Sequence, residues 1–440
     1  MRSDQQQAIN RLAGTSATAF LCAVLCVYPL YIDKFSNLGV TKFTGCFTLF
    51  LLFLLWLVAC TAIGARAPRP RNANAGRDVT LWGVLAFAGT SLISTFTSLS
   101  PTASTWGLGG YYGGLMLVLF TAAGYWAVRS YLDLENLDFV FWVLGITTSI
   151  VAVLYVLNIF NIDLIGAYAD TAVVERAQFF STLGQKDFNG CFFSVALPIV
   201  FYQFLNAKDT RTAVWTGIPA AFGALALAVV DSEALALGIG AAVMVLVCHK
   251  NFTTRHLRRA ALIGAEFFGW AAWMHYMRAS VYTQGGTALL AKLGAWQVAL
   301  PCMAASLLLW LVLFVLARKG IAAQAPLYLP GRVITIAVLA VGAMAFVLAN
   351  AMPNLPLPES LHNLLVFNDD WGTYRGVAWR AAFGTWADGS LLRKIVGVGP
   401  GMMHTAVAAW AGDAMTARMA TFYAAHNEYL EQLLTTGILG

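Results

Sequence analysis

Long apolar runs constrain this chain more than any other feature of its sequence. Between Phe47 and Ala59, for example, the residues are apolar on every face that a helix would present. A bilayer core of about 30 Å is crossed by a helix of roughly 20 such residues. Only 11% of the residues are charged, whereas charged residues make up about a quarter of a soluble domain. A membrane barrel would instead show short segments of alternating polarity. The sequence therefore predicts an all-α, polytopic integral membrane protein.

The apolar runs predict about eleven complete transmembrane helices within residues 15–352 of a single membrane domain. Residues 1–14 are polar and precede the first run, and a long polar loop covers 353–425. A twelfth helix is expected within 426–440. At 1.5 Å per residue it would reach only about 21 Å, so we expect it to be the start of a span. The eleven expected spans are 15–32, 43–64, 79–98, 113–128, 138–160, 189–205, 213–230, 234–248, 260–277, 293–317 and 333–352.

Lys and Arg are unevenly divided between the two sets of short loops. With the N-terminus placed in the cytoplasm, the inner side holds 16 of them and the outer short loops hold six. Cytoplasmic loops of membrane proteins carry such an excess. We therefore expect a multi-pass protein with a cytoplasmic N-terminus and with the loop 353–425 outside. The net charge of +6 follows from this topology, and no nucleic-acid partner is expected.

No cofactor or metal site is expected from the sequence. The seven cysteines fall in or beside predicted spans, where they pack as small apolar side chains. The run 397–401 (GVGPG) has the glycines of a phosphate loop. It lacks the preceding strand and the following Lys-Ser/Thr pair that such a loop requires. Chemistry is therefore to be sought among the polar residues of the expected outer face.

The segment 425–440, AHNEYLEQLLTTGILG, places His426 and Asn427 at the first turn of the last expected helix. The positive end of a helix dipole disfavours an imidazolium ion, so we expect a neutral ring there. A neutral imidazole can accept a proton from an attacking hydroxyl group. Asn427 either orients this ring or caps the helix through its side-chain oxygen. The alternative is a structural or interfacial histidine.

Residues 373–386 repeat apolar side chains at helical spacing within the long loop. A helix with aromatic residues along one side lies at the level of lipid headgroups, where Arg375 would face their phosphate groups. Arg380 projects from a different face. The alternative is a surface-anchoring helix whose arginines bind nothing specific. The expected shared face consists of Arg375, Ala378, Trp379, Ala382, Phe383 and Trp386.

Two further outer segments contain candidate residues. Arg176 precedes the run 181–184 (STLG), and it either binds a phosphate group or extends to lipid headgroups. Tyr112 belongs to the glycine-rich run 105–115, TWGLGGYYGGL. Its ring either stacks on a sugar or forms part of an aromatic belt at the membrane surface.

Together these segments resemble the O-antigen ligase and O-antigen polymerase family of membrane glycosyltransferases. The motifs are the His-Asn pair with a closing Gly-x-x-Gly, the Arg-x-x-x-Trp pair with a later glycine turn, and an arginine before a glycine-containing run. The likeness covers most of the chain in topology and about sixty residues in motif. It implies catalytic roles for His426, Arg375 and Arg176. It implies substrate-binding roles for Asn427, Trp379, Gly399, Gly401 and Tyr112.

The chain departs from the family pattern in two places. Gln185-Lys186-Asp187 stands where the family has Asn-Pro-Asn. Glu233 stands where the family has an arginine after a serine, so no phosphate-binding role is carried onto it. A carboxylate of the run 231–233 would contact an acceptor or serve only a structural purpose.

Members of this family transfer glycans from undecaprenyl-diphosphate carriers at the outer face of the bacterial inner (cytoplasmic) membrane. The resemblance implies a metal-independent, inverting glycosyltransferase with a lipid-linked glycan donor and a glycan, lipid or protein acceptor. Ligase and polymerase share these motifs, so both remain open. Two hypotheses of a different class are a small-anion transporter of the same superfamily and an inactive structural remnant. Transport requires ionisable residues paired along a path through the spans, whereas the polar residues here gather in the outer loops.

Overall fold

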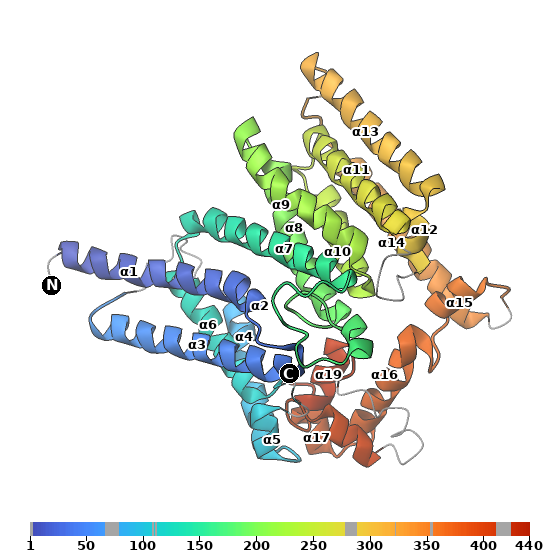
Figure 1. The fold of residues 1–440 in the computed structure, drawn as a ribbon. Helices are drawn as coiled ribbons and strands as arrows, with labels where there is room; N and C mark the ends of the chain where they lie inside the picture. The colour runs from blue at the N-terminus through green and yellow to red at the C-terminus, as the bar shows by residue number, and fades with distance from the viewer. Residues whose placement is uncertain are drawn as a thin grey trace. The chain divides into compact units, whose positions relative to one another are not determined.

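The regular secondary structure of the protein is helical, as Figure 1 shows. In the part of the chain that the structure describes, the only other pairing is two isolated β-bridges. The predicted all-α fold is therefore confirmed. The computed structural model describes residues 3–66, 79–107, 110, 112–277, 288–321, 323–352, 355–410 and 424–440.

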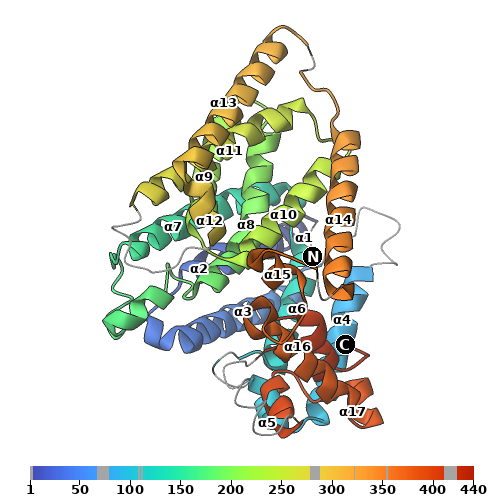
Figure 2. The same ribbon diagram turned by 90° about the vertical axis from the view of Figure 1, so that its right-hand side faces the viewer.

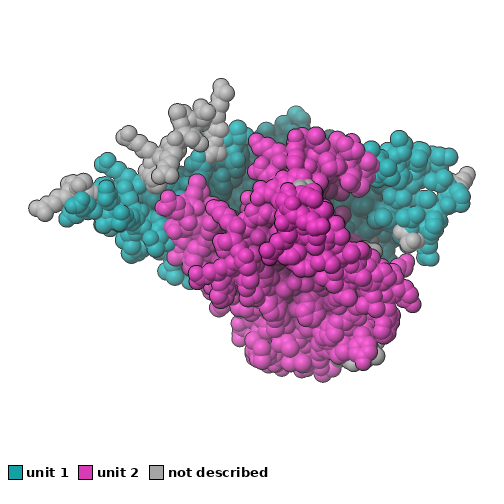
Figure 3. All heavy atoms as spheres, turned by 90° about the horizontal axis from the view of Figure 1, so that it is seen from above, with its two compact units in different colours: residues 1–17, 46–132, 339–440 teal, residues 18–45, 133–338 magenta. Residues whose placement is uncertain are grey.

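The chain forms two compact units, which Figure 3 colours separately. Unit 1 comprises residues 1–17, 46–132 and 339–440, and unit 2 comprises residues 18–45 and 133–338. Three of the four boundaries fall within α1 (Ser3–Cys22), α3 (Leu38–Ala62) and α14 (Tyr328–Ala351), and the fourth follows residue 132. The other helices of unit 1 are α4 Val79–Phe96, α5 Pro101–Trp106, α6 Leu115–Tyr131, α15 Glu359–Leu365, α16 Trp371–Ala387, α17 Leu391–Val396 and α19 Glu428–Thr435. The other helices of unit 2 are η1 Ala23–Val27, α2 Tyr28–Leu30, η2 Phe35–Asn37, η4 Leu134–Asn136, α7 Leu137–Ile159, η5 Val173–Gln178, α8 Lys186–Asn206, α9 Thr210–Val229, α10 Glu233–Cys248, α11 Thr254–Tyr276, α12 Ala288–Gly294 and α13 Trp296–Arg318.

Eight helical segments among the described residues are long and apolar enough to cross a membrane. This number confirms a polytopic membrane protein, although it is smaller than the eleven complete spans expected. The eight segments are Asp4–Leu30, Phe35–Ala62, Val79–Phe96, Leu134–Ile159, Lys186–Asn206, Thr210–Val229, Trp296–Arg318 and Tyr328–Ala351.

The three remaining expected spans are helices that fall short in length or in composition. α6 has 17 residues and α10 has 16, whereas a bilayer core needs roughly 20. α11 has 23 residues, but charged side chains are unfavourable within a bilayer. Its charged residues are Arg255, Arg258, Arg259 and Glu266.

Two terminal segments also differ from expectation. α1 begins at Ser3, so most of the polar segment 1–14 continues into the first apolar helix. α19 ends at Thr435, and Gly437 adopts a left-handed φ of 74°. Residues 426–440 therefore do not form one continuous helix, because the backbone turns at that glycine.

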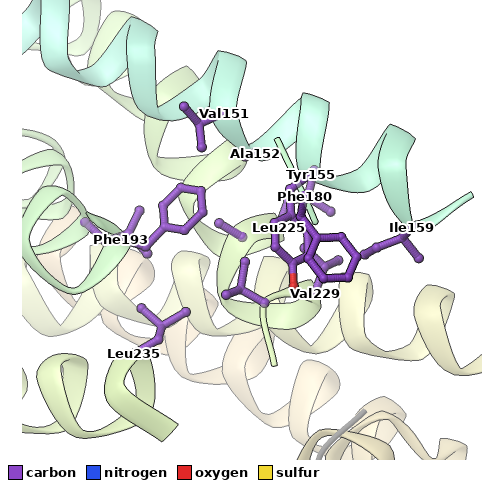
Figure 4. Packing of buried hydrophobic residues seen from close by; sticks show 12 residues of the cluster. Val151, Ala152, Tyr155, Ile159, Phe180, Phe193, Leu225, Val229 and Leu235 are labelled. Carbon is purple, nitrogen blue, oxygen red and sulfur yellow. The ribbon is translucent and has the colours of Figure 1, made fainter. Parts of the chain in front are cut away.

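The core of unit 2 lies among α7, α8, α9 and α10. Half of the apolar stretch of α7 is buried, whereas the corresponding figure is 6% for α13 and for α14. α7 is thus an interior helix of its unit, and α13 and α14 present apolar side chains outward. Figure 4 shows the packing of this core. Its members include Val151, Tyr155, Phe180, Phe193, Leu225 and Val229.

The expected outer loop 353–425 is largely helical where the structure describes it. α15, α16 and α17 follow one another in unit 1, as Figure 2 shows. Residues 403–410 are also helical. α16 and the helical residues 403–410 share a buried cluster of mostly small side chains, to which α19 contributes as well. That cluster positions the candidate site.

Candidate functional site

The segment that carries Arg375 and the segment that carries His426 pack together within unit 1. α16 buries Val377, Ala378, Ala381 and Ala382 in a cluster that also contains Ala425, the residue before His426. All five are at most 1% exposed. Small side chains allow two backbones to approach closely, so α16 and the turn before α19 lie against each other. Two motifs 50 residues apart in sequence therefore belong to one structural site.

The face of α16 that is buried within the protein consists of Val377, Ala378, Ala381 and Ala382. Phe383, which belongs to the face expected at the headgroup level, is 51% exposed. The prediction of a helix over 373–386 is confirmed, and the placement of its aromatic face at the membrane surface stays a prediction. The close approach of α19 selects small residues, which a pattern of apolar spacing alone does not distinguish from large ones.

Arg375 and Arg380 differ in their surroundings. Arg375 is half-buried in the second turn of α16, directly after Tyr374, whose φ is 68°. The guanidinium of Arg380 forms an ion pair with the carboxylate of Asp369. Arg380 thus has a structural partner at the start of its own segment.

Trp379 presents a hydrogen-bond donor to the site. Its ring lies 5.0 Å from the ring of Trp371 and 6.0 Å from the ring of Phe367, measured between centroids. Its indole Nε1 is buried and has no hydrogen-bond acceptor within the described ranges. Buried indole N–H groups usually find an acceptor. A polar substrate group would supply one here.

His426 is exposed and lies in the left-handed backbone region, with φ at 52°. Asn427 follows as the N-cap of α19, with φ at −151°. Its Oδ1 accepts hydrogen bonds from the backbone N–H groups of Tyr429 at 3.1 Å and Leu430 at 3.3 Å. Helix capping, one of the two roles expected for Asn427, is therefore confirmed.

Glu431 is a site residue that sequence reasoning missed. Its Oε2 accepts a hydrogen bond of 2.8 Å from the backbone N–H of Ala425. Burial raises the pKa of Glu431 to about 7, and the Ala425 N–H opposes this shift by favouring the ionised form. The signal in the sequence was an acidic residue four positions after a helix N-cap. A side chain at that position can reach back over the first turn of the helix.

The glycine turn 397–401 joins the end of α19 by main-chain hydrogen bonds. Val398 N–H donates to the Leu434 carbonyl at 3.1 Å, and Gly399 N–H donates to the Thr435 carbonyl at 2.9 Å. Gly397 has φ at 78°, and a Cβ atom there would overlap the Thr435 carbonyl group. The turn therefore requires glycine both for its conformation and for its close approach.

The same turn also meets the segment that carries Tyr112. A Cβ atom on Gly401 would lie 3.2 Å from the Cα of Gly107. Tyr112 is half-buried and has φ at 53°. A Cβ atom on Gly399 would overlap the hydroxyls of Ser98 and Ser104. Gly399 and Gly401 thus have a packing role that is sufficient to explain them, and their substrate-binding role stays a prediction.

Arg176 belongs to unit 2, unlike the other seven candidate residues. It lies in the 3₁₀ segment η5 and is half-buried. Its guanidinium carbon lies 5.4 Å from the centroid of the Tyr168 ring. Its Nε donates to the Thr171 carbonyl at 3.4 Å. The aromatic face and the carbonyl orient the side chain, so Arg176 is held by specific contacts.

The turn that follows Arg176 is organised by Asn189 at the start of α8. The Asn189 Nδ2 donates to the carbonyls of Phe180, Gly184 and Gln185 at 3.0–3.2 Å. Its Oδ1 accepts from the Ser181 hydroxyl at 2.6 Å. A single buried carboxamide therefore closes this turn, even though Gln185-Lys186-Asp187 replaces the family's usual residues.

The carboxylates near α10 form their own polar group in unit 2. The Nζ of Lys186 lies 3.7 Å from Oδ2 of Asp231. The Ser232 hydroxyl donates to Oδ1 of Asp187 at 2.9 Å. These contacts tie the start of α8 to the start of α10, which is a structural role. The possible contact of this group with an acceptor stays a prediction.

The protein was compared with protein-family models, with curated proteins and with solved structures, and no match was found in any of the three.

Proposed function

We propose that the protein is a membrane glycosyltransferase of the O-antigen ligase type. It would transfer a glycan from an undecaprenyl-diphosphate carrier to an acceptor on the extracytoplasmic side. The observation that carries this proposal is the packing of α16 against the turn before α19 in unit 1, through Val377, Ala378 and Ala425. It places the helix bearing Arg375 and Trp379 against the segment bearing His426.

The chemistry needs a base and a means of stabilising the leaving group. The imidazole of His426 would take the proton from the acceptor hydroxyl as its oxygen bonds to the anomeric carbon. The bond from that carbon to the diphosphate oxygen breaks, and the electron pair leaves with the diphosphate. Attack from the opposite side inverts the anomeric carbon.

Arginine suits the growing negative charge of the diphosphate. A guanidinium stays protonated and donates a planar pair of N–H groups to phosphate oxygens. Cations fixed where charge develops stabilise the transition state more than the ground state. Arg375 would act in this way, and the role of Arg176, which belongs to unit 2, stays an implication of the resemblance. Trp379, whose Nε1 has no acceptor among the described residues, would donate to a sugar or phosphate oxygen.

The deciding experiment replaces His426 by Ala in the full-length protein and follows the surface glycans of cells that lack the native gene. We expect transfer to fall by a factor of about 100 or more, the size of a general-base contribution. His362→Ala is the matched control, because His362 also precedes an asparagine and is also exposed. Transfer retained by the His426 variant at equal protein level would remove the proposed base.

A second pair of variants tests the cation. Arg375→Lys keeps the positive charge but loses the planar fork, and Arg375→Ala loses both. We expect transfer to decline in that order. Equal activity of both variants and the wild type would contradict a phosphate-binding role for Arg375.

The glycan profile of the gene deletion also separates the two versions of this function. Loss of glycan attachment with normal chain length indicates a ligase, whose acceptor is a different molecule. Loss of chain length indicates a polymerase, whose acceptor is another lipid-linked repeat.

A further inference from the structure

Glu431 is a carboxylate in an unfavourable place. It is half-buried in α19, and the charged neighbour that acts on it is Glu428, which has the same sign. An apolar side chain at this position would avoid the desolvation of a charge. The specific contact that the carboxylate makes is the acceptance of the Ala425 N–H at 2.8 Å.

That contact fixes one side of His426. Ala425 is fully buried, so its N–H cannot turn to bulk water and needs an acceptor within the protein. On the other side, the side chain of Asn427 holds the first N–H groups of α19. His426 lies between these two fixed points, in a left-handed conformation (φ 52°) that non-glycine residues adopt only when their surroundings impose it.

We propose that Glu431 is a positioning residue that fixes the backbone before His426 and thereby sets the direction of the imidazole. The role of that imidazole as a base rests on the proposed function, whereas the fixing of the backbone does not. Glu431 acts through Ala425 and touches no reacting atom. Together with the Asn427 cap, Glu431 holds the backbone on both sides of the exposed His426 ring.

Hydrogen exchange measured by mass spectrometry tests the fixing directly, with the full-length protein in lipid nanodiscs. Glu431→Leu keeps the size of the side chain and removes the acceptor, and Glu431→Gln retains an acceptor oxygen. We expect the peptide that spans 424–428 to exchange on the order of tenfold faster in Glu431→Leu and to be nearly unchanged in Glu431→Gln. Glu428→Leu is the matched control, because Glu428 is exposed on the same helix and its Oε1 accepts from the Gln432 side chain instead.

The surface-glycan assay then reads the consequence for the imidazole. We expect Glu431→Leu to lose transfer, and Glu431→Gln and Glu428→Leu to retain it. Exchange in Glu431→Leu equal to that of the wild type would overturn the proposal, whatever the activity. Faster exchange with full transfer would also overturn the positioning role. If His426→Ala is fully active while Glu431→Leu exchanges faster, the proposed function fails and the fixing of the backbone stands.

Discussion

The two candidate arginines are held in contrasting ways. Arg375 stands on a 17-residue helix whose small residues pack against the turn before His426. Arg176 stands in a six-residue 3₁₀ segment, where an aromatic ring and a carbonyl hold it and Asn189 closes the next turn. The first site depends on close backbone packing and the second on side-chain hydrogen bonds. Substitutions that damage one kind of support should therefore leave the other intact.

The largest effect is expected in unit 1, from Gly397→Ala. A left-handed non-glycine residue costs about 1–3 kcal/mol, and here the added Cβ also overlaps the Thr435 carbonyl. We expect a loss of about 3 kcal/mol or more, read as a large fall in Tm in detergent. Gly166→Ala in unit 2 is the control, since its φ is 73° but the Cβ meets open space. Equal falls in the two variants would contradict the packing argument.

A smaller effect is expected in unit 2, from Asn189→Ala. This change removes one carboxamide that serves three carbonyls and the Ser181 hydroxyl. Each buried group left without a partner loses about 1–3 kcal/mol, and partial rearrangement should limit the total to about 2–3 kcal/mol. Thermal unfolding measures the total. Proteolytic cleavage within residues 173–184 should also become faster in Asn189→Ala. It should stay unchanged in Gly397→Ala if the Asn189 hydrogen bonds and the glycine turn of unit 1 are independent.

The pH dependence of stability provides a smaller test. In unit 1, burial raises the pKa of Glu431 from 4.5 to about 7. The folded state then binds a proton more tightly than the unfolded state, so stability falls as pH rises from about 4.5 to 7. The Tm of Glu431→Gln should rise relative to the wild type between pH 5 and pH 8. A constant difference would show that Glu431 does not titrate in this range.

No change in activity is expected on removal of divalent ions. If arginine stabilises the diphosphate, EDTA should leave transfer of glycan by purified membranes within about twofold of the untreated rate. Loss of transfer in EDTA that is restored by adding Mg²⁺ or Mn²⁺ would contradict the proposal that arginine stabilises the leaving diphosphate.

The helices were predictable because their apolar residues recur over long stretches. All eleven expected spans coincide with helices, and α16 begins and ends within two residues of the predicted segment. α11 shows where this reasoning stops, since its arginines occur in the same helix as its apolar run. Length and apolar content locate a helix, but neither states which helices cross the membrane.

The supporting residues of the site were less accessible to sequence reasoning. Arg375, Trp379 and His426 were proposed from their motifs, whereas Glu431 was not, because its contact is with a backbone N–H on the far side of a turn. The burial of Ala381 likewise depends on segments that are distant in sequence. A contact with the main chain does not depend on which amino acid supplies the N–H or carbonyl group, so the sequence does not indicate it.

The glycine turn is joined to α19 by two main-chain hydrogen bonds. The N–H groups of Val398 and Gly399 donate to the carbonyls of Leu434 and Thr435. Any amino acid except proline offers the same N–H and C=O groups. The bonds themselves therefore do not depend on which side chains Val398 and Leu434 carry, whereas the glycines of the turn cannot gain a Cβ atom without losing the close approach that these bonds require.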